Sequence, residues 1–445
     1  MRRSFVPNRR TGLMAVLVLL VTGCAPVSGN TQGGTVSVVA TWEGAEKDAF
    51  MAIVEPFEQR TGIVVKYTST RDLSGKLWKG VATGDVPDVA GLPGPGEMQE
   101  FARAGALVDL NKAIDVAAYK AETAPAFVQL GTVDDQLVGV FTKSTVKGLI
   151  WFNPKMYTLG EPSTWTELLR NAAISARGTT KTWCVGLESG EASGWPGTDW
   201  IEDIVLRQGG PAVYDDWVAG KVRWTSPQIR AAFEAFGTVV APSAVYGGSA
   251  AVVGTNFGDA STPMFSNPPG CIFTHQGSFM TSFFRGTSGA HDDEFDFFPF
   301  PAMDPRYGNS LIAAGDLFAM FHDTPQARAL ISYLAGAEAQ SMIAKRGGAL
   351  SPNVNVTYPD ELSRRESALL QSASIVRFDA SDLMPEAMNE AFWRATVDYA
   401  RDPYQLDRIL ASLDDVQAQA YGTGPGGTGP AGTAPGQSSP GSTQR

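Results

Sequence analysis

The chain has 445 residues, with 46 acidic and 35 basic side chains and a formal net charge of −11 at pH 7. Because it is acidic and lacks clusters of Lys and Arg, nucleic acid and anionic lipid headgroups are excluded as expected partners. Its length exceeds what one hydrophobic core normally serves, so we expect two domains of about 150 to 200 residues each.

The first residues have the order of charged and apolar residues that is typical of an export signal. Residues 1–10 carry four Arg and no acidic residue, residues 13–21 form an apolar run, and small residues precede Cys24. This order predicts a lipoprotein signal peptide over residues 1–23 and acylation of the Cys24 thiol. An uncleaved signal anchor is the alternative, but a membrane-spanning helix needs about 20 apolar residues. We therefore expect an extracytoplasmic protein that is anchored to the cell membrane through lipid on Cys24.

Strands and helices alternate after a tether over residues 24–34, whose composition favours flexible coil. The apolar periodicity predicts strands at 35–41, 63–68 and 87–92 and helices at 50–57 and 73–82. This alternation is typical of a parallel α/β sheet. Ligands bind outside the carboxyl ends of the strands in such a sheet, and this places Trp42, Glu43, Arg71 and Asp72 along one edge.

A second set of elements predicts a second α/β domain. Residues 139–152, which include Trp151, form a strand-like stretch that is long enough to cross between domains. Thr164 and Glu167 fit a capping box at the start of a helix. Later strands are predicted at 183–187, 271–276, 295–301 and 311–321. Residues 314–316 interrupt the last of them, which indicates a close approach of two backbones.

These elements give the expected domain boundaries. The first lobe takes residues 35–140 and is completed by about 300–345, and the second lobe takes residues 141–299 and about 346–421. Residues 422–445 consist mainly of Gly, Pro, Thr, Ser and Ala. Because this composition cannot build a core, we expect a disordered tail.

The chain contains three Cys residues. Once Cys24 carries lipid, Cys184 and Cys271 remain in an oxidising compartment, so we expect one disulfide between them. Closing a loop of that length stabilises a fold by about 4 to 5 kcal/mol in the chain-entropy model. Two separate buried thiols are the alternative, because Cys is commonly buried as a plain hydrophobe.

Short phrases along the chain carry a family resemblance. Three of these phrases are moderately specific. They are the lipobox, which is the short run of small residues that ends at Cys24, and the stretches Glu58–Ile63 and Gly84–Val89. More specific are Glu188–Gly190, Gly194–Asp203, Phe298–Pro301, Ala314–Leu317 and Arg377–Pro385. Together they resemble the extracellular solute-binding proteins (family 1) of carbohydrate ABC importers, and most closely the α-glucoside-binding branch. The resemblance spans residues 35–413.

This resemblance implies an α/β, two-lobed, periplasmic-binding-protein-like fold with hinge-crossing strands. Such a protein closes on a sugar, here of the trehalose, maltose, sucrose or maltodextrin class, and delivers it to ABC permease subunits. A pyranose presents hydroxyls at its edge and C–H groups on its faces, so its site needs aromatic rings beside carboxylates, amides and guanidinium groups. The candidate ligand-binding residues are Trp42, Glu43, Arg71, Asp72, Trp151, Trp195, Asp199, Trp200, Gln276, Asp316 and Arg377.

Each candidate also has an ordinary structural role as an alternative. Tryptophans near strand ends commonly pack in cores. Glu43 would favour the N-terminus of the next helix, and Asp199 would cap a helix. Arg377 would pair with Asp379 at the surface, and Asp316 would serve a tight turn.

The main alternative class is a secreted glycoside-processing enzyme, and the next is a binding protein for another polar solute. Glycoside hydrolysis needs two carboxylates about 5 to 9.5 Å apart, one on each side of the bond. Asp199, Glu202 and Asp203 lie on one predicted helix, from which they cannot flank a glycosidic bond. The sequence has no Gly-x-Ser-x-Gly turn, and its three His residues lack metal-site spacing. We therefore expect no catalysis, no cofactor and no metal.

Overall fold

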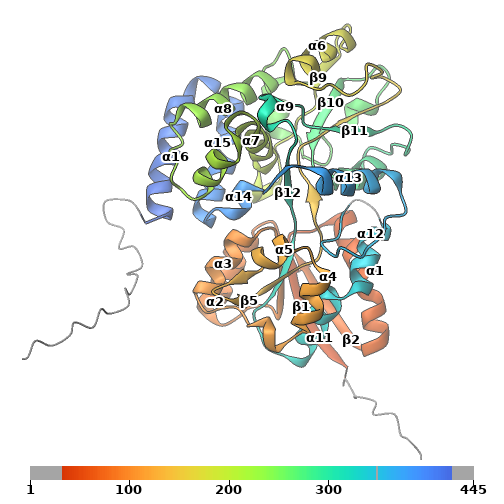
Figure 1. The fold of residues 1–445 in the computed structure, drawn as a ribbon, viewed down its shortest axis with the longest axis vertical. Helices are drawn as coiled ribbons and strands as arrows, with labels where there is room; N and C mark the ends of the chain where they lie inside the picture. Colours follow the sequence, from red (N-terminus) through yellow and green to blue (C-terminus); the bar gives the residue numbers. More distant parts are fainter. Residues whose placement is uncertain (1–32, 347–348, 423–445) are drawn as a thin grey trace, which may run out of the picture.

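Two α/β lobes, one above the other in Figure 1, make up the computed structural model of the chain. The structure describes residues 33–346 and 349–422. The predicted signal peptide, Cys24 and the tether up to residue 32 lie outside the described residues, and so does the predicted tail from residue 423 onward. Within the two described ranges, no helix combines the length and the hydrophobicity needed to cross a membrane. The α/β class predicted from the sequence is confirmed.

The first lobe is built on a five-stranded sheet in the order β2-β1-β3-β13-β6. Its strands are β1 (Gly34–Ala40), β2 (Ile63–Ser69), β3 (Val89–Leu92), β6 (Gly139–Phe141) and β13 (Leu317–Met320). Strand β1 pairs in parallel with β2 and β3, whereas β13 runs antiparallel between β3 and β6. All four residues of β3 are buried, as expected for a strand that is covered on both faces.

Helices cover both faces of this sheet. They are α1 (Gly44–Thr61), α2 (Leu73–Thr83), α3 (Pro95–Arg103), α4 (Val116–Glu122), α5 (Pro125–Leu130), α11 (Pro325–Ala335) and α12 (Ala337–Arg346), beside a hairpin of β4 (Thr132–Val133) and β5 (Gln136–Leu137). Val36 and Val38 of β1 face α1 and α11, and Val39 faces the opposite core with α2 and α3, because side chains alternate along a strand. Gly62 and Gly84 end α1 and α2 in the left-handed conformation, with φ of 70° and 75°, which turns the chain toward the next strand.

The second lobe is built on a four-stranded sheet in the order β11-β8-β10-β9. Its strands are β8 (Leu149–Phe152), β9 (Lys181–Trp183), β10 (Cys271–Gln276) and β11 (Asp296–Pro299). Its helices are α6 (Trp165–Ser175), α7 (Trp195–Val218), α8 (Pro227–Val239), α9 (Gly248–Gly254), α10 (Met280–Gly286), α13 (Glu361–Ser372), α14 (Ala380–Leu383), α15 (Glu386–Arg401) and α16 (Leu406–Ala420). The Thr164 hydroxyl accepts a hydrogen bond from the Glu167 N–H at 3.2 Å, so the predicted cap of α6 is confirmed.

The disulfide between Cys184 and Cys271 is present, with the two Cα atoms 5.6 Å apart, which confirms that prediction. It joins the chain just after β9 to the first residue of β10. The predicted strand over residues 183–187 is wrong beyond Trp183. The Cys184 N–H still donates to the Phe273 carbonyl of β10, but the chain then leaves the sheet, and the Leu187 N–H bonds to the carbonyl of Val252 instead.

A small sheet of β14 (Ile375–Phe378), β12 (Ser310–Ala314) and β7 (Thr145–Val146) lies where the chain passes between the lobes. The single strand predicted over residues 139–152 is therefore β6, β7 and β8, and Gly148, with φ of 70°, makes the turn before β8. The interruption predicted at residues 314–316 is confirmed between β12 and β13. A Cβ atom on Gly315 would lie 2.5 Å from the Lys143 carbonyl oxygen, so only glycine allows the two crossing segments to approach so closely.

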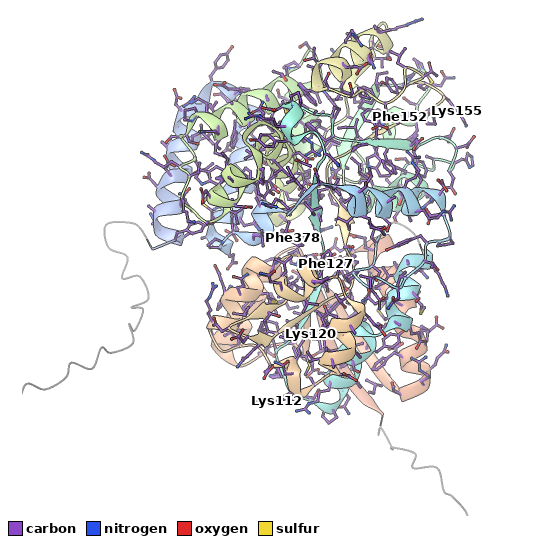
Figure 2. The ribbon with its side chains drawn as sticks, in the orientation of Figure 1. Lys112, Lys120, Phe127, Phe152, Lys155 and Phe378 are labelled. Carbon is purple, nitrogen blue, oxygen red and sulfur yellow. A yellow bond between two sulfur atoms is a disulfide. The ribbon has the colours of Figure 1, made fainter. Side chains whose placement is uncertain are left out.

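Aromatic rings join the lobes behind this crossing. The Phe378 ring of β14 lies 5.9 Å from that of Phe141 and 6.4 Å from that of Phe127, in edge-on contacts. Figure 2 shows Phe378 and Phe127 facing each other across the boundary between the lobes. Such contacts add to the apolar area that the boundary buries.

Candidate ligand-binding cleft between the lobes

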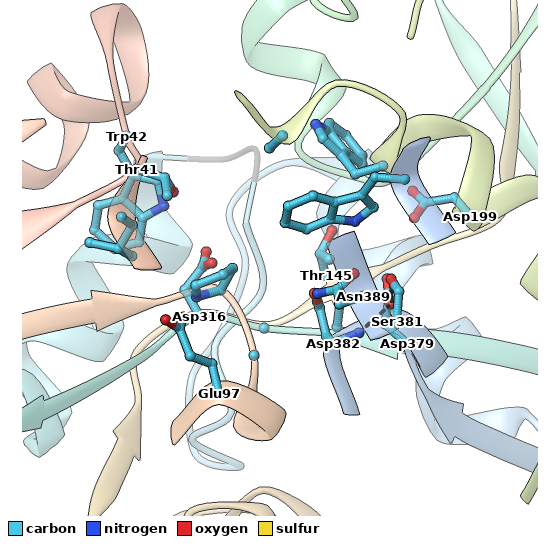
Figure 3. A pocket seen from close by; sticks show the side chains of 18 of the residues that line it. Thr41, Trp42, Glu97, Thr145, Asp199, Asp316, Asp379, Ser381, Asp382 and Asn389 are labelled. Carbon is cyan, nitrogen blue, oxygen red and sulfur yellow. Dashed lines mark hydrogen bonds between the residues drawn. The ribbon is translucent and has the colours of Figure 1, made fainter. Parts of the chain in front are cut away.

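A cleft that opens to solvent lies between the two lobes (Figure 3). The first lobe lines it with the turns after β1, β2 and β3 and with the start of α3. The second lobe lines it with the start of α7, with α14 and with α15. The carboxyl ends of parallel strands meet at one edge of a sheet, which is why the three turns of the first lobe converge here.

Trp42 presents its indole to the cleft from the first lobe. It follows β1, is 7% exposed, and packs against Phe50 and Phe318 with ring centroids 5.4 and 5.5 Å away. The Lys143 ammonium lies 4.4 Å from its ring centroid, a distance at which a cation attracts an aromatic face. Trp42 is therefore fixed by packing, and only the part of its ring that borders the cleft is free for a ligand.

Trp195 presents a second indole from the second lobe. It is the first residue of α7 and packs against Phe257 and Phe279 with centroids 4.9 and 5.9 Å away. The Lys147 ammonium lies 4.8 Å from its ring centroid. Trp195 is only partly buried, so it offers more ring surface to the cleft than Trp42 does.

Lys143 lies in the segment that crosses between the lobes and binds two carboxylates. Its ammonium is 2.8 Å from Asp316 and 3.2 Å from Glu46. Burial would lower the pKa of Lys143, but Asp316 and Glu46 raise it to about 12. The ammonium thus stays charged at physiological pH and connects α1 with the turn between β12 and β13.

Lys147, four residues later, binds the carboxylates of the second lobe. Its ammonium is 2.9 Å from both oxygens of Asp199 and 3.1 Å from Asp379. Burial opposes its charge, but Asp199, Asp379 and Asp382 raise the pKa of Lys147 well above its usual value. Burial also raises the pKa of Asp199, against the attraction of Lys147. Burial and Asp379 raise the pKa of Asp382 well above its usual range. The carboxyl groups around Lys147 therefore do not ionise equally.

The part of the cleft between α3 and α15 is rich in carboxyl groups. Burial raises the pKa of Glu97 to about 8, although the neighbouring Ser74 hydroxyl reduces the rise. Burial and then Glu390 raise the pKa of Glu386 to about 7. The backbone N–H of Glu386 donates to Glu100 at 3.2 Å, which joins α15 to α3 across the lobe boundary. At neutral pH Glu97 therefore keeps its proton and acts as a neutral acid.

Four buried polar atoms in this part of the cleft make no hydrogen bond with any described residue. They are Ser74 Oγ, Glu97 Oε1, Asn389 Oδ1 and Trp393 Nε1. Glu97 belongs to α3 of the first lobe, whereas Asn389 and Trp393 lie four residues apart on α15 of the second. Figure 3 shows Glu97 and Asn389 on opposite sides of the open space.

Six of the eleven candidate residues line this cleft, and they are Trp42, Arg71, Asp72, Trp195, Asp199 and Asp316. Trp42, Arg71 and Asp72 line it because they follow the carboxyl ends of parallel strands. Trp195 and Asp199 line it because of their spacing along α7. Residues four apart on a helix share a face, so Trp195 and Asp199 point into the cleft together.

The candidates Trp151, Trp200 and Gln276 lie in the core instead. Trp151 of β8 is fully buried, and its indole N–H donates to the Gln276 carbonyl at 3.0 Å. Trp200 is five residues after Trp195, which turns it away from the cleft and against the His275 ring at 4.2 Å. Gln276 is buried in β10, at 4% exposure. We leave these three out of the site.

The candidates Glu43 and Arg377 lie outside the cleft lining as well. Glu43 is exposed at the residue before α1, and its side chain makes no capping hydrogen bond. The Arg377 guanidinium pairs with Asp215 at 2.9 Å and not with Asp379, because Asp379 turns inward to Lys147. Both residues are therefore also left out of the site.

Several cleft residues were not among the candidates, and they include Glu97, Lys143, Lys147, Asn389 and Trp393. The two lysines lie in the segment that crosses between the lobes. Two charged residues inside a predicted strand were the sequence feature that could have identified them. Glu97, Asn389 and Trp393 lie on ordinary amphipathic helices, where no local pattern separates a cleft residue from a surface residue.

Known proteins share both the sequence and the fold. The family model of the bacterial extracellular solute-binding proteins matches residues 42–341. The chain belongs to this family. The osmoprotective compounds-binding protein GgtB of Synechocystis sp. is 37% identical over 401 residues, covering 87% of this chain and 94% of that protein. The alpha-glucosides-binding periplasmic protein AglE of Rhizobium meliloti is 34% identical over 385 residues, covering 83% and 84%. A solved chitin oligosaccharide binding protein shares the fold, with a TM-score of 0.76 at 17% identity over 87% of this chain and 98% of that one.

Family membership confirms the family predicted from the sequence phrases and excludes the enzyme among the classes considered above. The chain is a solute-binding protein and not an enzyme, and its family is extracellular, which agrees with the expected export. Among the residues that the structure describes, no group of three or more His, Cys, Asp or Glu is arranged to hold a metal ion.

Proposed function

We propose that this protein is the receptor of an ABC sugar importer and captures an α-glucoside or a related oligosaccharide in the cleft between its lobes. The observation that carries this proposal is the pair of Trp42 and Trp195, one from each lobe, each beside carboxylates on the same cleft. Sugar C–H faces pack on indole rings, and sugar hydroxyls donate to carboxylates. The relatives named for α-glucosides and for osmoprotective compounds support a small hydroxylated solute.

Capture works through the position of the lobes. A ligand that contacts both Trp42 and Trp195 binds the closed arrangement better than an open one, and it shifts the population toward closure. The crossing segment with Lys143 and Lys147 links the two halves of the site, so closure brings both tryptophans to the ligand together. The permease then receives the closed, loaded form.

The proposed receptor is held at the membrane through Cys24. Replacing Cys24 by Ala removes the thiol that the lipobox presents for acylation. We expect the variant in the culture medium or as an unprocessed precursor, measured by fractionation and mass spectrometry. Processed C24A protein that stays in the membrane fraction would contradict the anchor and leave the sugar site untouched.

The ligand proposal is tested with the purified mature protein and a panel of trehalose, maltose, sucrose and maltotriose. A ligand at 100 times its Kd stabilises the folded state by about 2.7 kcal/mol, which a thermal melt detects. We expect at least one disaccharide to raise the Tm and to be recovered intact. No shift with any sugar, together with a shift caused by a non-sugar solute, would overturn the proposal.

A further inference from the structure

Glu97 Oε1, Asn389 Oδ1 and Trp393 Nε1 are buried without a hydrogen-bond partner among the described residues, and all three side chains line one end of the cleft. A buried polar atom without a partner destabilises a protein, because it has lost its hydrogen bonds to water. Polar atoms of this kind are uncommon in folded proteins, and three of them at one end of a cleft indicate a bound group that completes their hydrogen bonds.

The chemistry of the three atoms identifies that group. Asn389 Oδ1 accepts hydrogen bonds, the neutral carboxyl group of Glu97 can accept one and donate one, and Trp393 Nε1 only donates one. A cation would satisfy the acceptors alone, and an anion would satisfy the donors alone. A hydroxyl group both donates and accepts, so an array of hydroxyls fits the whole set, and the Trp393 ring offers an apolar surface beside it.

The three residues also bridge the two lobes. Glu97 is on α3, whereas Asn389 and Trp393 are four residues apart on α15 and so share one helix face. The Glu386 N–H, at the start of α15, already donates to Glu100 of α3 at 3.2 Å. A group held between α3 and α15 would therefore contact both lobes in addition to the contacts at Trp42 and Trp195.

We infer that Glu97, Asn389 and Trp393 form a second subsite that binds a second hydroxylated unit of the ligand. The protein then selects a disaccharide, or a glycoside with a hydroxylated aglycone, over a single sugar. This inference rests on the proposed function, in which the first unit is held between Trp42 and Trp195. It adds the minimum size of the ligand and the residues that recognise its second part.

Three variants remove the hydrogen-bonding atoms and keep the shape, and they are Glu97→Leu, Asn389→Leu and Trp393→Phe. Their binding is measured by calorimetry with maltose, trehalose and sucrose as two-unit probes and methyl α-D-glucopyranoside as the one-unit probe. We expect each variant to lose about tenfold in affinity for the two-unit probe that binds wild type, with the affinity for the one-unit probe unchanged. Glu97→Gln should restore binding, because it replaces one neutral hydrogen-bonding group by another.

Stability of the unliganded protein separates recognition from a structural role. Because the three atoms lack partners, Glu97→Leu and Asn389→Leu should melt at or above the wild-type temperature. Arg401→Ala is the matched control on α15, since Arg401 is exposed, pairs with Asp398 and lies outside the cleft lining. It should change neither affinity.

Two results would overturn the second subsite. One is an equal loss of affinity for the one-unit and two-unit probes in all three variants. The other is an unchanged affinity together with a lower melting temperature of the unliganded variants. If wild type binds none of the sugars, the proposed function fails and the subsite fails with it, whereas wild-type binding with insensitive variants refutes the subsite alone.

Discussion

The ammonium of Lys147 lies 2.9 Å from both carboxylate oxygens of Asp199, and it also lies 4.8 Å from the centroid of the Trp195 ring. Asp199 is one turn after Trp195 on α7, so the ion pair and the indole share one face of the helix. Lys147 belongs to the segment that crosses between the lobes. One side chain thus connects the crossing segment to the tryptophan of the second lobe, as Lys143 does for Trp42 in the first.

Replacing Lys147 by Met should strongly destabilise the protein. The change leaves Asp199 and Asp379 buried without their cation, and breaking a buried ion pair in this way costs about 3 to 5 kcal/mol. The penalty should grow with rising pH, because burial already raises the pKa of Asp199 in the wild type and, without Lys147, burial opposes the ionisation of both carboxyl groups. Urea unfolding between pH 5 and pH 8 measures both effects. Lys155→Met is the control, since Lys155 pairs with Asp293 at the surface, and it should change stability by less than about 1 kcal/mol. A pH-independent K147M penalty would contradict this account.

Replacing Trp195 by Ala should weaken sugar binding by about tenfold, because the aromatic surface for the sugar is lost. The matched comparison is Trp200→Ala on the same helix. Trp200 is 1% exposed and packs in the core, so its loss should destabilise the unliganded protein by about 3 to 5 kcal/mol. Calorimetry with the sugar that binds wild type, beside urea unfolding of both variants, separates the two roles. An unchanged affinity of W195A would remove Trp195 from the site.

Strand ends and helix spacing made part of the site predictable. Trp42, Arg71 and Asp72 follow parallel strands, and the position of those turns depends only on the order of strands and helices. Trp195 and Asp199 both line the cleft because residues four apart share one face of α7. Trp200 and Trp151 were predicted for the site but lie in the core. The direction in which a tryptophan side chain points depends on its position around the helix and on the packing of the core. Neither can be predicted from the residue type or from its nearness in sequence to a cleft residue.

Contacts between distant segments could not be predicted. The role of Lys143 depends on Asp316, 173 positions later, and that of Lys147 on Asp379, and neither partner is visible from the local sequence. The long strand predicted over residues 139–152 failed for a similar reason. Its two apolar ends were predicted to form one strand across the polar residues between them, but the left-handed turn at Gly148 and the pairing of each piece with a different sheet divide it into three strands.

Removing the disulfide should destabilise the protein without altering the cleft. Cys184 and Cys271 are 87 positions apart, and constraining a loop of this length in the unfolded chain stabilises the fold by about 4 to 5 kcal/mol. The double variant Cys184→Ser, Cys271→Ser should lose most of this free energy of unfolding in urea. Its affinity for the sugar should match wild type, because neither residue lines the cleft. Equal stability of the oxidised and reduced wild-type protein would contradict the expected contribution.

Glu366 on α13 gives a pH dependence of stability that is separate from the cleft. It is 1% exposed, its Oε1 has no hydrogen-bond partner among the described residues, and burial raises its pKa to about 8. The unfolded chain releases this proton near pH 4.5, so the stability that Glu366 confers is complete below that pH and is lost as pH rises to about 8. Glu366→Gln should therefore flatten this part of the profile and stabilise the protein by about 4 kcal/mol at pH 8. Glu361→Gln, on the exposed face of the same helix, is the control and should change stability by less than about 1 kcal/mol. Urea unfolding from pH 5 to pH 9 decides the matter, and parallel profiles for E366Q and wild type would show that Glu366 ionises normally in the folded protein.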